Sequence, residues 1–84
     1  MKMYYITFRS VTWAQRGEKL LNENRYRCQL RRTPRWMEEK GCGYCLQMML
    51  GDIRPPVQLL RGAGLPLRKV YVQEADGGMT EVVV

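Results

Sequence analysis

The sequence contains no histidine, and this absence removes a large class of chemistry. Without an imidazole the chain has no Cys-His nucleophile pair and no usual general base near neutral pH. It also cannot build a Cys/His zinc site within one chain. A conventional hydrolase is therefore a poor fit, and we do not expect an enzyme of that kind.

Long hydrophobic runs and a disulfide framework are missing as well. No apolar run approaches the roughly 20 residues that span a bilayer. Arg9 interrupts the apolar stretch after Met1, and no small-residue cleavage site of a signal peptide follows. The three cysteines are an odd number without framework spacing, so we expect thiols in a reducing compartment. We therefore predict a cytoplasmic protein with no membrane partner.

The composition is that of an ordinary globular chain with a basic surface. Of the 84 residues, 45% are hydrophobic and 26% are charged, which predicts one domain over residues 1–84. The formal charge of +6 attracts polyanions. However, the basic residues are scattered, and few aromatic residues are expected to be exposed for base stacking. We therefore expect no specific nucleic-acid partner.

Four segments alternate between apolar and polar residues with the period of a strand, and two helical segments separate them. The predicted strands are 3–8, 26–31, 44–50 and 67–72, and the predicted helices follow Ser10 and Asp52. This order predicts an α+β fold of the ferredoxin-like β-α-β-β-α-β type, a four-stranded antiparallel sheet with two helices on one face. The core spans about 3–72. The tail 73–84 is either an extra edge strand or frayed.

Three details of the first half follow from local pattern. Ser10 is the expected helix N-cap, with Thr12 as the competing choice. Gly17 costs about 1 kcal/mol inside a helix, which close packing on a sheet would explain. Cys28 shares the apolar face of its predicted strand with Tyr26 and Leu30, so we expect a buried core thiol.

The stretch Lys40–Cys45 is the strongest candidate site. Cys42 stands between Gly41 and Gly43, which lets backbone and solvent approach its sulfur. Positive charge lowers a thiol pKa and favours the nucleophilic thiolate. The cationic residues upstream of Cys42 are Arg31, Arg32, Arg35 and Lys40, opposed by Glu38 and Glu39.

The predicted topology adds a second influence on Cys42. The strand that follows Cys42 should start beside the end of the first strand, where Arg9 and Ser10 open the first helix. A helix N-terminus carries about half a positive charge and unpaired N–H groups. We therefore expect Cys42 to be the most acidic of the three thiols.

The chain resembles a small family described as selenium/sulfur carrier-like over roughly residues 3–72. The residues that carry the resemblance are the run 5–10, the turn Thr33-Pro34-Arg35, and Cys42-Gly43 with Leu46. The resemblance implies a carrier that takes and passes on sulfur or selenium at Cys42. It implies a cysteine desulfurase or a small sulfur-acceptor protein as partner, and no cofactor beyond the covalently carried atom.

The chain departs from the pattern of that family at two places. Glu39, Lys40 and Gly41 stand where small polar residues are expected, and Cys45 replaces a small apolar residue. Cys42 and Cys45 have Cys-x-x-Cys spacing, so Cys45 is a candidate resolving thiol in a dithiol switch. That spacing opens a helix in oxidoreductases, whereas here it leads into a predicted strand.

Other interpretations of the sequence remain open at this point. The chain could be an interaction module whose cysteines are incidental, or could share a zinc ion across a dimer. The face of the sheet away from the helices would carry Met3, Tyr5, Cys45 and Met49, which suggests a homodimer surface. Trp36 is either a plug in the core or a lid over the site.

Overall fold

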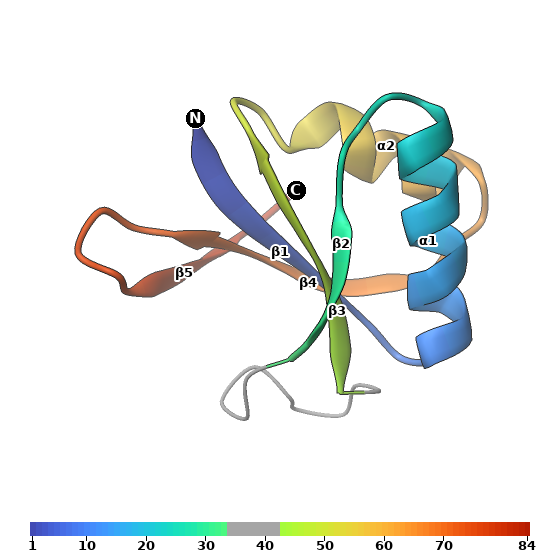
Figure 1. The fold of residues 1–84 in the computed structure, drawn as a ribbon, viewed down its shortest axis with the longest axis horizontal. Coiled ribbons are helices and arrows are strands. Elements are labelled where there is room, and N and C mark those ends of the chain that lie inside the picture. The colour runs from blue at the N-terminus through green and yellow to red at the C-terminus, as the bar shows by residue number, and fades with distance from the viewer. Residues whose placement is uncertain (34–42) are drawn as a thin grey trace.

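The computed structural model describes residues 1–33 and 43–84. In these ranges the chain forms two helices and five strands (Figure 1). In chain order the elements are β1 (Lys2–Phe8), α1 (Val11–Glu23), β2 (Gln29–Arg32), β3 (Tyr44–Leu50), α2 (Arg54–Gly62), β4 (Leu67–Gln73) and β5 (Met79–Val82). None of the described helices is long and apolar enough to cross a membrane.

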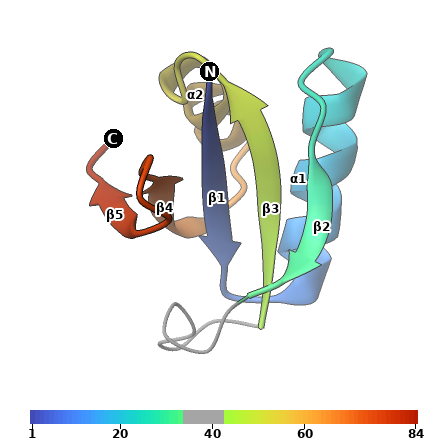
Figure 2. The same cartoon turned by 60° about the vertical axis from the view of Figure 1, so that its left-hand side comes forward.

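The strands form one antiparallel sheet in the order β2-β3-β1-β4-β5. Both helices lie on the same side of this sheet (Figures 1 and 2). Thr7 near the end of β1 pairs with Cys45 near the start of β3. This register places the start of β3 beside the end of β1, where α1 follows after two residues.

The sheet has an inner face under the helices and an outer face, which we call the open face. Ile6 and Phe8 of β1 point inward and are fully buried with Leu46 of β3 and Leu60 of α2. The strand period places alternate residues on the open face. The open-face residues used below are Met3, Tyr5, Thr7, Arg31, Cys45, Gln47, Met49, Tyr71 and Gln73.

Gly17 explains how closely α1 approaches the sheet. A Cβ atom at this position would lie 3.1 Å from Phe8 Cζ, 3.2 Å from Leu46 Cδ1 and 3.3 Å from Leu60 Cδ2. All three neighbours are fully buried side chains of the core. The glycine is therefore kept in the helix interior by close packing, as the sequence predicts.

Two predictions about the strands need correction. The sheet has five strands rather than four, because the tail returns as β5 and pairs with β4 from Gln73 to Val70. β2 begins at Gln29 rather than Tyr26, because the backbone before it is still held by α1: Tyr26 N–H donates to Leu21 O at 2.8 Å. The α+β class, the helices on one face and the antiparallel pairing agree with the prediction. The assignment to the ferredoxin-like group stays a prediction.

The start of α2 also differs in detail. Its N-cap position is Ile53, which has no side-chain cap, rather than Asp52. Asp52 instead accepts hydrogen bonds from Arg54 N–H at 3.0 Å and from Arg54 Nε at 3.2 Å. This contact lowers the pKa of the Asp52 carboxyl, chiefly through the hydrogen bond from the Arg54 side chain.

Candidate functional site

The backbone on the two sides of the segment with the candidate cysteine is held together at Thr33 and Gly43. Thr33 N–H donates to Gly43 O at 2.8 Å, and both residues are buried. Gly43 has a φ of 82°, a left-handed conformation that residues with a Cβ rarely adopt. The buried Thr33 hydroxyl has no hydrogen-bond partner in the structure. Gly43 therefore fixes the backbone directly after Cys42 and holds it to the end of β2.

Four of the predicted site residues lie outside the described residues. They are Arg35, Lys40, Gly41 and Cys42. Trp36 lies there as well, so the choice between plug and lid stays open. Their roles therefore stay predictions.

Cys45 is placed on β3 and faces the open side of the sheet. It stands between Thr7 of β1 and Arg31 of β2 in the strand pairing, and its exposed fraction is 0%. The sequence predicts its face but not its complete burial. A thiol that solvent does not reach cannot be attacked by an outside thiol, so any reaction of Cys45 must be with a group already beside it.

The start of α1 has the cap that the sequence predicts. Ser10 Oγ accepts a hydrogen bond from Trp13 N–H at 3.2 Å, so Ser10 rather than Thr12 is the N-cap. Arg9 is exposed between β1 and this cap. The partial positive charge of the helix N-terminus and the Arg9 side chain thus lie at the same end of the sheet as Gly43.

Arg32, the last residue of β2, lies at this end of the sheet as well. Its guanidinium is 5.4 Å from the ring centroid of Tyr44, and its Nη1 donates to the Tyr44 hydroxyl at 3.3 Å. Both contacts hold the side chain along β3, because a planar guanidinium is attracted to the face of an aromatic ring. Arg32 is therefore oriented by Tyr44, two residues after Cys42.

Cys28 is confirmed as a buried thiol away from this end of the sheet. It is 8% exposed, and its Sγ lies 3.8 Å from Glu18 O. Burial and, second, the negative charge of Glu18 raise the pKa of Cys28 to about 11. Because the thiolate form is disfavoured, Cys28 is unsuited to nucleophilic chemistry.

A chain of side-chain hydrogen bonds crosses the open face and was not expected from the sequence. Arg31 Nε donates to Gln47 Oε1 at 3.0 Å, Gln47 Nε2 donates to the Tyr5 hydroxyl at 3.2 Å, and that hydroxyl donates to Gln73 Oε1 at 3.4 Å. The four residues come from β2, β3, β1 and β4. The open face is therefore divided by an ordered polar belt rather than being evenly half-apolar.

The described residues contain no group of three or more Cys, Asp or Glu side chains that could hold a metal ion. They also contain no carboxylate beside Cys45 in the strand pairing. What the described part offers is therefore a strand end with a fixed backbone at Gly43.

The sequence pattern of one protein family matches residues 3–72 of this chain, and that family is described as "Putative Se/S carrier protein-like". The matched range contains α1, β2, β3 and α2, and all but one residue of β1 and of β4. It includes both cysteines of the Cys-x-x-Cys pair. No curated protein and no solved structure matches the chain.

Proposed function

We propose, since this chain belongs to the Se/S carrier protein-like family, that it carries sulfur or selenium covalently on Cys42. The observation that carries the proposal is the family match over residues 3–72, which spans Cys42 and the elements on both sides of it. The Thr33–Gly43 hydrogen bond and the left-handed Gly43 support it, because they fix the chain directly after that cysteine.

The proposed step is an exchange between two sulfurs. The Cys42 thiolate attacks the terminal sulfur of a donor persulfide. The sulfur–sulfur bond of the donor breaks, a new one forms on Cys42, and the electron pair leaves on the donor thiolate. The same exchange in reverse passes the atom to an acceptor, and a selenium atom follows the same path. Each transfer balances without an outside oxidant.

The absence of histidine makes electrostatics the means of forming the Cys42 thiolate. No general base of the usual kind is present to take its proton. The N-terminus of α1 with Arg9 and the oriented Arg32 supply positive charge at this end of the sheet. The thiol is thus activated by its surroundings rather than by a catalytic partner.

The chemistry of the carried atom indicates which partners the protein needs. The donor is a cysteine desulfurase, which forms a persulfide on its own cysteine, and the receiver is a small sulfur-acceptor protein. The carrier needs no resident cofactor, because the transferred atom is its only cargo. The sequence also predicts a homodimer that pairs through the open faces and would present two Cys42 sites. Because such a dimer would cover Met3 and Met49, it is an alternative to any partner that binds these residues.

The dithiol function is the second candidate. It is favoured by the spacing of Cys42 and Cys45 but weakened by two observations. Tyr44–Leu50 is a strand and not the helix that this spacing opens in oxidoreductases. Cys45 is completely buried. Cys45 could therefore only close on Cys42 itself and could not exchange with an outside dithiol.

Intact mass distinguishes these functions after incubation with a purified cysteine desulfurase and cysteine. We expect the wild type and Cys45→Ser to gain the mass of one sulfur atom, and Cys42→Ser to gain none. If instead the wild type loses the mass of two hydrogen atoms and neither variant does, the dithiol function replaces the carrier function. An unchanged mass in all three proteins would leave an interaction module.

A further inference from the structure

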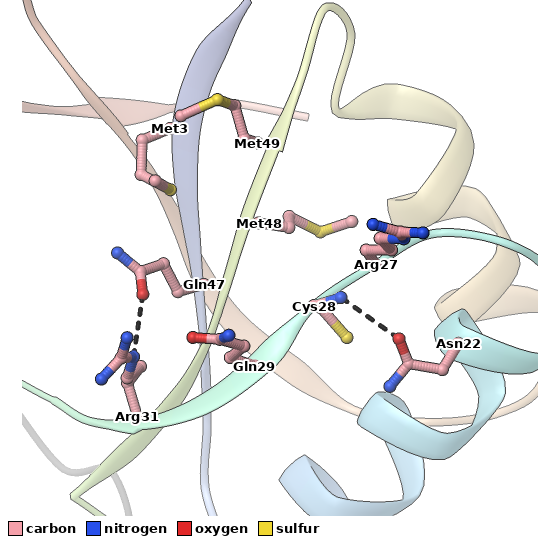
Figure 3. Close-up of a pocket in the computed structure, with 9 residues that line it drawn as sticks. All are labelled: Met3, Asn22, Arg27, Cys28, Gln29, Arg31, Gln47, Met48 and Met49. Carbon is pink, nitrogen blue, oxygen red and sulfur yellow. Dashed lines mark hydrogen bonds between the residues drawn. The ribbon is translucent and has the colours of Figure 1, made fainter.

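A groove opens at the β2 edge of the sheet, beyond the point where the pairing of β2 and β3 stops. The last pair is Gln29 with Gln47, and the groove beside it has a volume of about 600 Å³ (Figure 3). Its walls include Arg27 and Arg31 from the β2 side and Met3 and Met49 from the open face, and none of the described residues that line it is aromatic.

The two arginines bring positive charge to the groove, and no carboxylate of the described residues is paired with it. Neither Arg27 nor Arg31 forms an ion pair with a carboxylate within residues 1–33 and 43–84. Arg31 uses only its Nε–H in the described contacts, toward Gln47 Oε1 at 3.0 Å (Figure 3). Its terminal N–H groups keep the fork geometry that pairs with a carboxylate. The groove is therefore complementary to an anionic partner.

The edge of the sheet at the start of β2 is partly closed to the addition of another strand. Cys28 N–H donates to Asn22 Oδ1 at 3.2 Å (Figure 3), and Leu30 N–H donates to Glu18 Oε2 at 3.0 Å. These α1 side chains occupy the N–H groups that an edge strand would otherwise offer to a partner. A partner that docks beside Cys28 and Leu30 is therefore held by side chains rather than by a shared sheet.

The apolar part of the groove suits a protein partner better than a nucleic acid. Met49 is 56% exposed, and flexible thioether side chains adapt to different apolar partners. Methionine and arginine are both enriched in protein interfaces. Proteins that bind single-stranded nucleic acids use aromatic rings to stack the bases, and the part of the chain that the structure describes places none in this groove.

We propose that the groove docks an acidic segment of a partner protein. Carboxylates of that segment pair with Arg27 and Arg31, and its apolar side chains pack on Met3 and Met49. The role of this partner rests on the proposed function: it is the protein that delivers or collects the carried atom. Arg31 stands opposite Cys45 in the strand pairing, so the groove leads along β3 toward the end with Gly43.

The test uses a synthetic peptide of alternating glutamate and leucine as the probe, titrated into isotope-labelled protein. The protein is the Cys42→Ser variant, which cannot carry sulfur, so that binding is measured apart from carrier chemistry. We expect NMR shift changes at the Arg27 and Arg31 side-chain N–H groups and at the Met3 and Met49 methyl groups. Raising the salt concentration should weaken binding, because exposed charges are screened.

Charge reversal provides matched variants. Arg27 and Arg61 are both exposed, but Arg61 lies in the last turn of α2 and does not line this groove. Arg27→Glu should weaken peptide binding by about fivefold or more, whereas Arg61→Glu, with the same change in net charge, should change it less than about twofold. If both variants weaken binding equally, net charge alone explains the loss of affinity, and the proposal is overturned.

Three further outcomes also decide the proposal. If the peptide does not bind but the desulfurase still loads Cys42 of the wild type, the docking proposal is overturned and the carrier function stands. If the peptide binds at the groove but Cys42 is never loaded, the carrier function is overturned and the docking site stands. A single-stranded oligouridylate that displaces the peptide from the same residues would make this a nucleic-acid surface instead.

Discussion

We expect the three thiols of this chain to differ in reactivity, because their surroundings differ. Cys28 has a pKa raised to about 11 by burial and by Glu18. Cys45 is closed to solvent, and Cys42 precedes a glycine at the end of the sheet. We expect Cys42 to be alkylated by iodoacetamide much faster than the other two thiols near neutral pH. Peptide mapping by mass spectrometry measures the three rates, and a faster Cys28 or Cys45 would contradict the assignment of the site.

The contribution of Glu18 to the Cys28 pKa can be measured separately. Glu18→Gln removes the negative charge but keeps an oxygen that can accept the Leu30 N–H. We expect the pKa of Cys28 to fall but to stay above its ordinary value, because burial is the larger cause. Alkylation rates against pH should show this shift. Glu23→Gln, on an exposed residue of the same helix, is the control and should leave the rates unchanged.

The raised pKa also makes the stability of the fold depend on pH. The thiol of Cys28 goes from an ordinary pKa of 9.0 in the unfolded chain to about 11 in the folded one. Between these values the unfolded chain has lost the proton that the folded chain still holds. The contribution of this group to the free energy of unfolding is therefore present below pH 9 and falls as the pH rises toward 11. Cys28→Ala should remove this part of the pH dependence.

At the scale of elements, the edge of β2 is protected by α1. Glu18 and Asn22 are four residues apart and so lie on one face of the helix, from which they accept hydrogen bonds from the alternate N–H groups of Leu30 and Cys28. This arrangement couples a helix to a short edge strand that would otherwise be open to pairing with another chain. The sequence shows the helix and the strand but not this coupling.

Asn22→Ala tests the protection of the edge. The substitution removes the acceptor for Cys28 N–H, and we expect a loss of about 0.5–1 kcal/mol in the free energy of unfolding. Amide hydrogen exchange at Cys28 should be faster in the variant than in the wild type. In the variant it should also be faster than exchange at the paired residues of β3. Gln15→Ala, at an exposed position of the same helix, is the control. Unchanged exchange at Cys28 would show that Asn22 does not protect this edge.

The packing of α1 on the sheet makes Gly17 sensitive to the smallest addition. Gly17→Ala gains about 1 kcal/mol of helix propensity but forces a methyl group within 3.1–3.3 Å of three fully buried side chains. Overpacking of a tight core costs about 1–3 kcal/mol, so we expect a net loss of about 1 kcal/mol. Gly62→Ala is the matched control, because nothing lies within 4 Å of its added Cβ. Chemical denaturation of both variants measures the difference, and a more stable Gly17→Ala would contradict the packing argument.

Local pattern predicts much of this structure, since many of its features depend on neighbours in sequence. The strand period assigns Cys45 and Met49 to the open face, and the Ser10 cap and the burial of Cys28 follow from residue type and spacing. The polar belt could not be predicted, because it joins residues up to 68 positions apart, Tyr5 and Gln73. The burial of Cys45 likewise depends on the tertiary structure around its strand.

At the scale of the whole molecule, β5 extends the sheet beyond the part that the family match covers. The match ends at residue 72, whereas β5 spans Met79–Val82. The strand pairs with β4, Val82 packs against the core, and Lys69 Nζ lies 3.7 Å from Glu81 Oε1. β5 is thus joined only to β4 in the sheet, three positions away from β3, which follows Cys42.

Truncation after Gly78 therefore separates stability from the proposed carrier chemistry. The shortened chain loses the β4–β5 pairing and the packing of Val82, which we expect to lower the free energy of unfolding by about 2–3 kcal/mol. The order β2-β3-β1-β4 and the Thr33–Gly43 hydrogen bond involve no residue of β5. Under conditions in which both chains are folded, Cys42 should therefore gain sulfur from the desulfurase at the same rate with and without β5. Circular dichroism establishes folding, and intact mass against time gives the rate. A truncated chain that folds but no longer accepts sulfur would show that the tail takes part in the transfer, for example by contacting the donor.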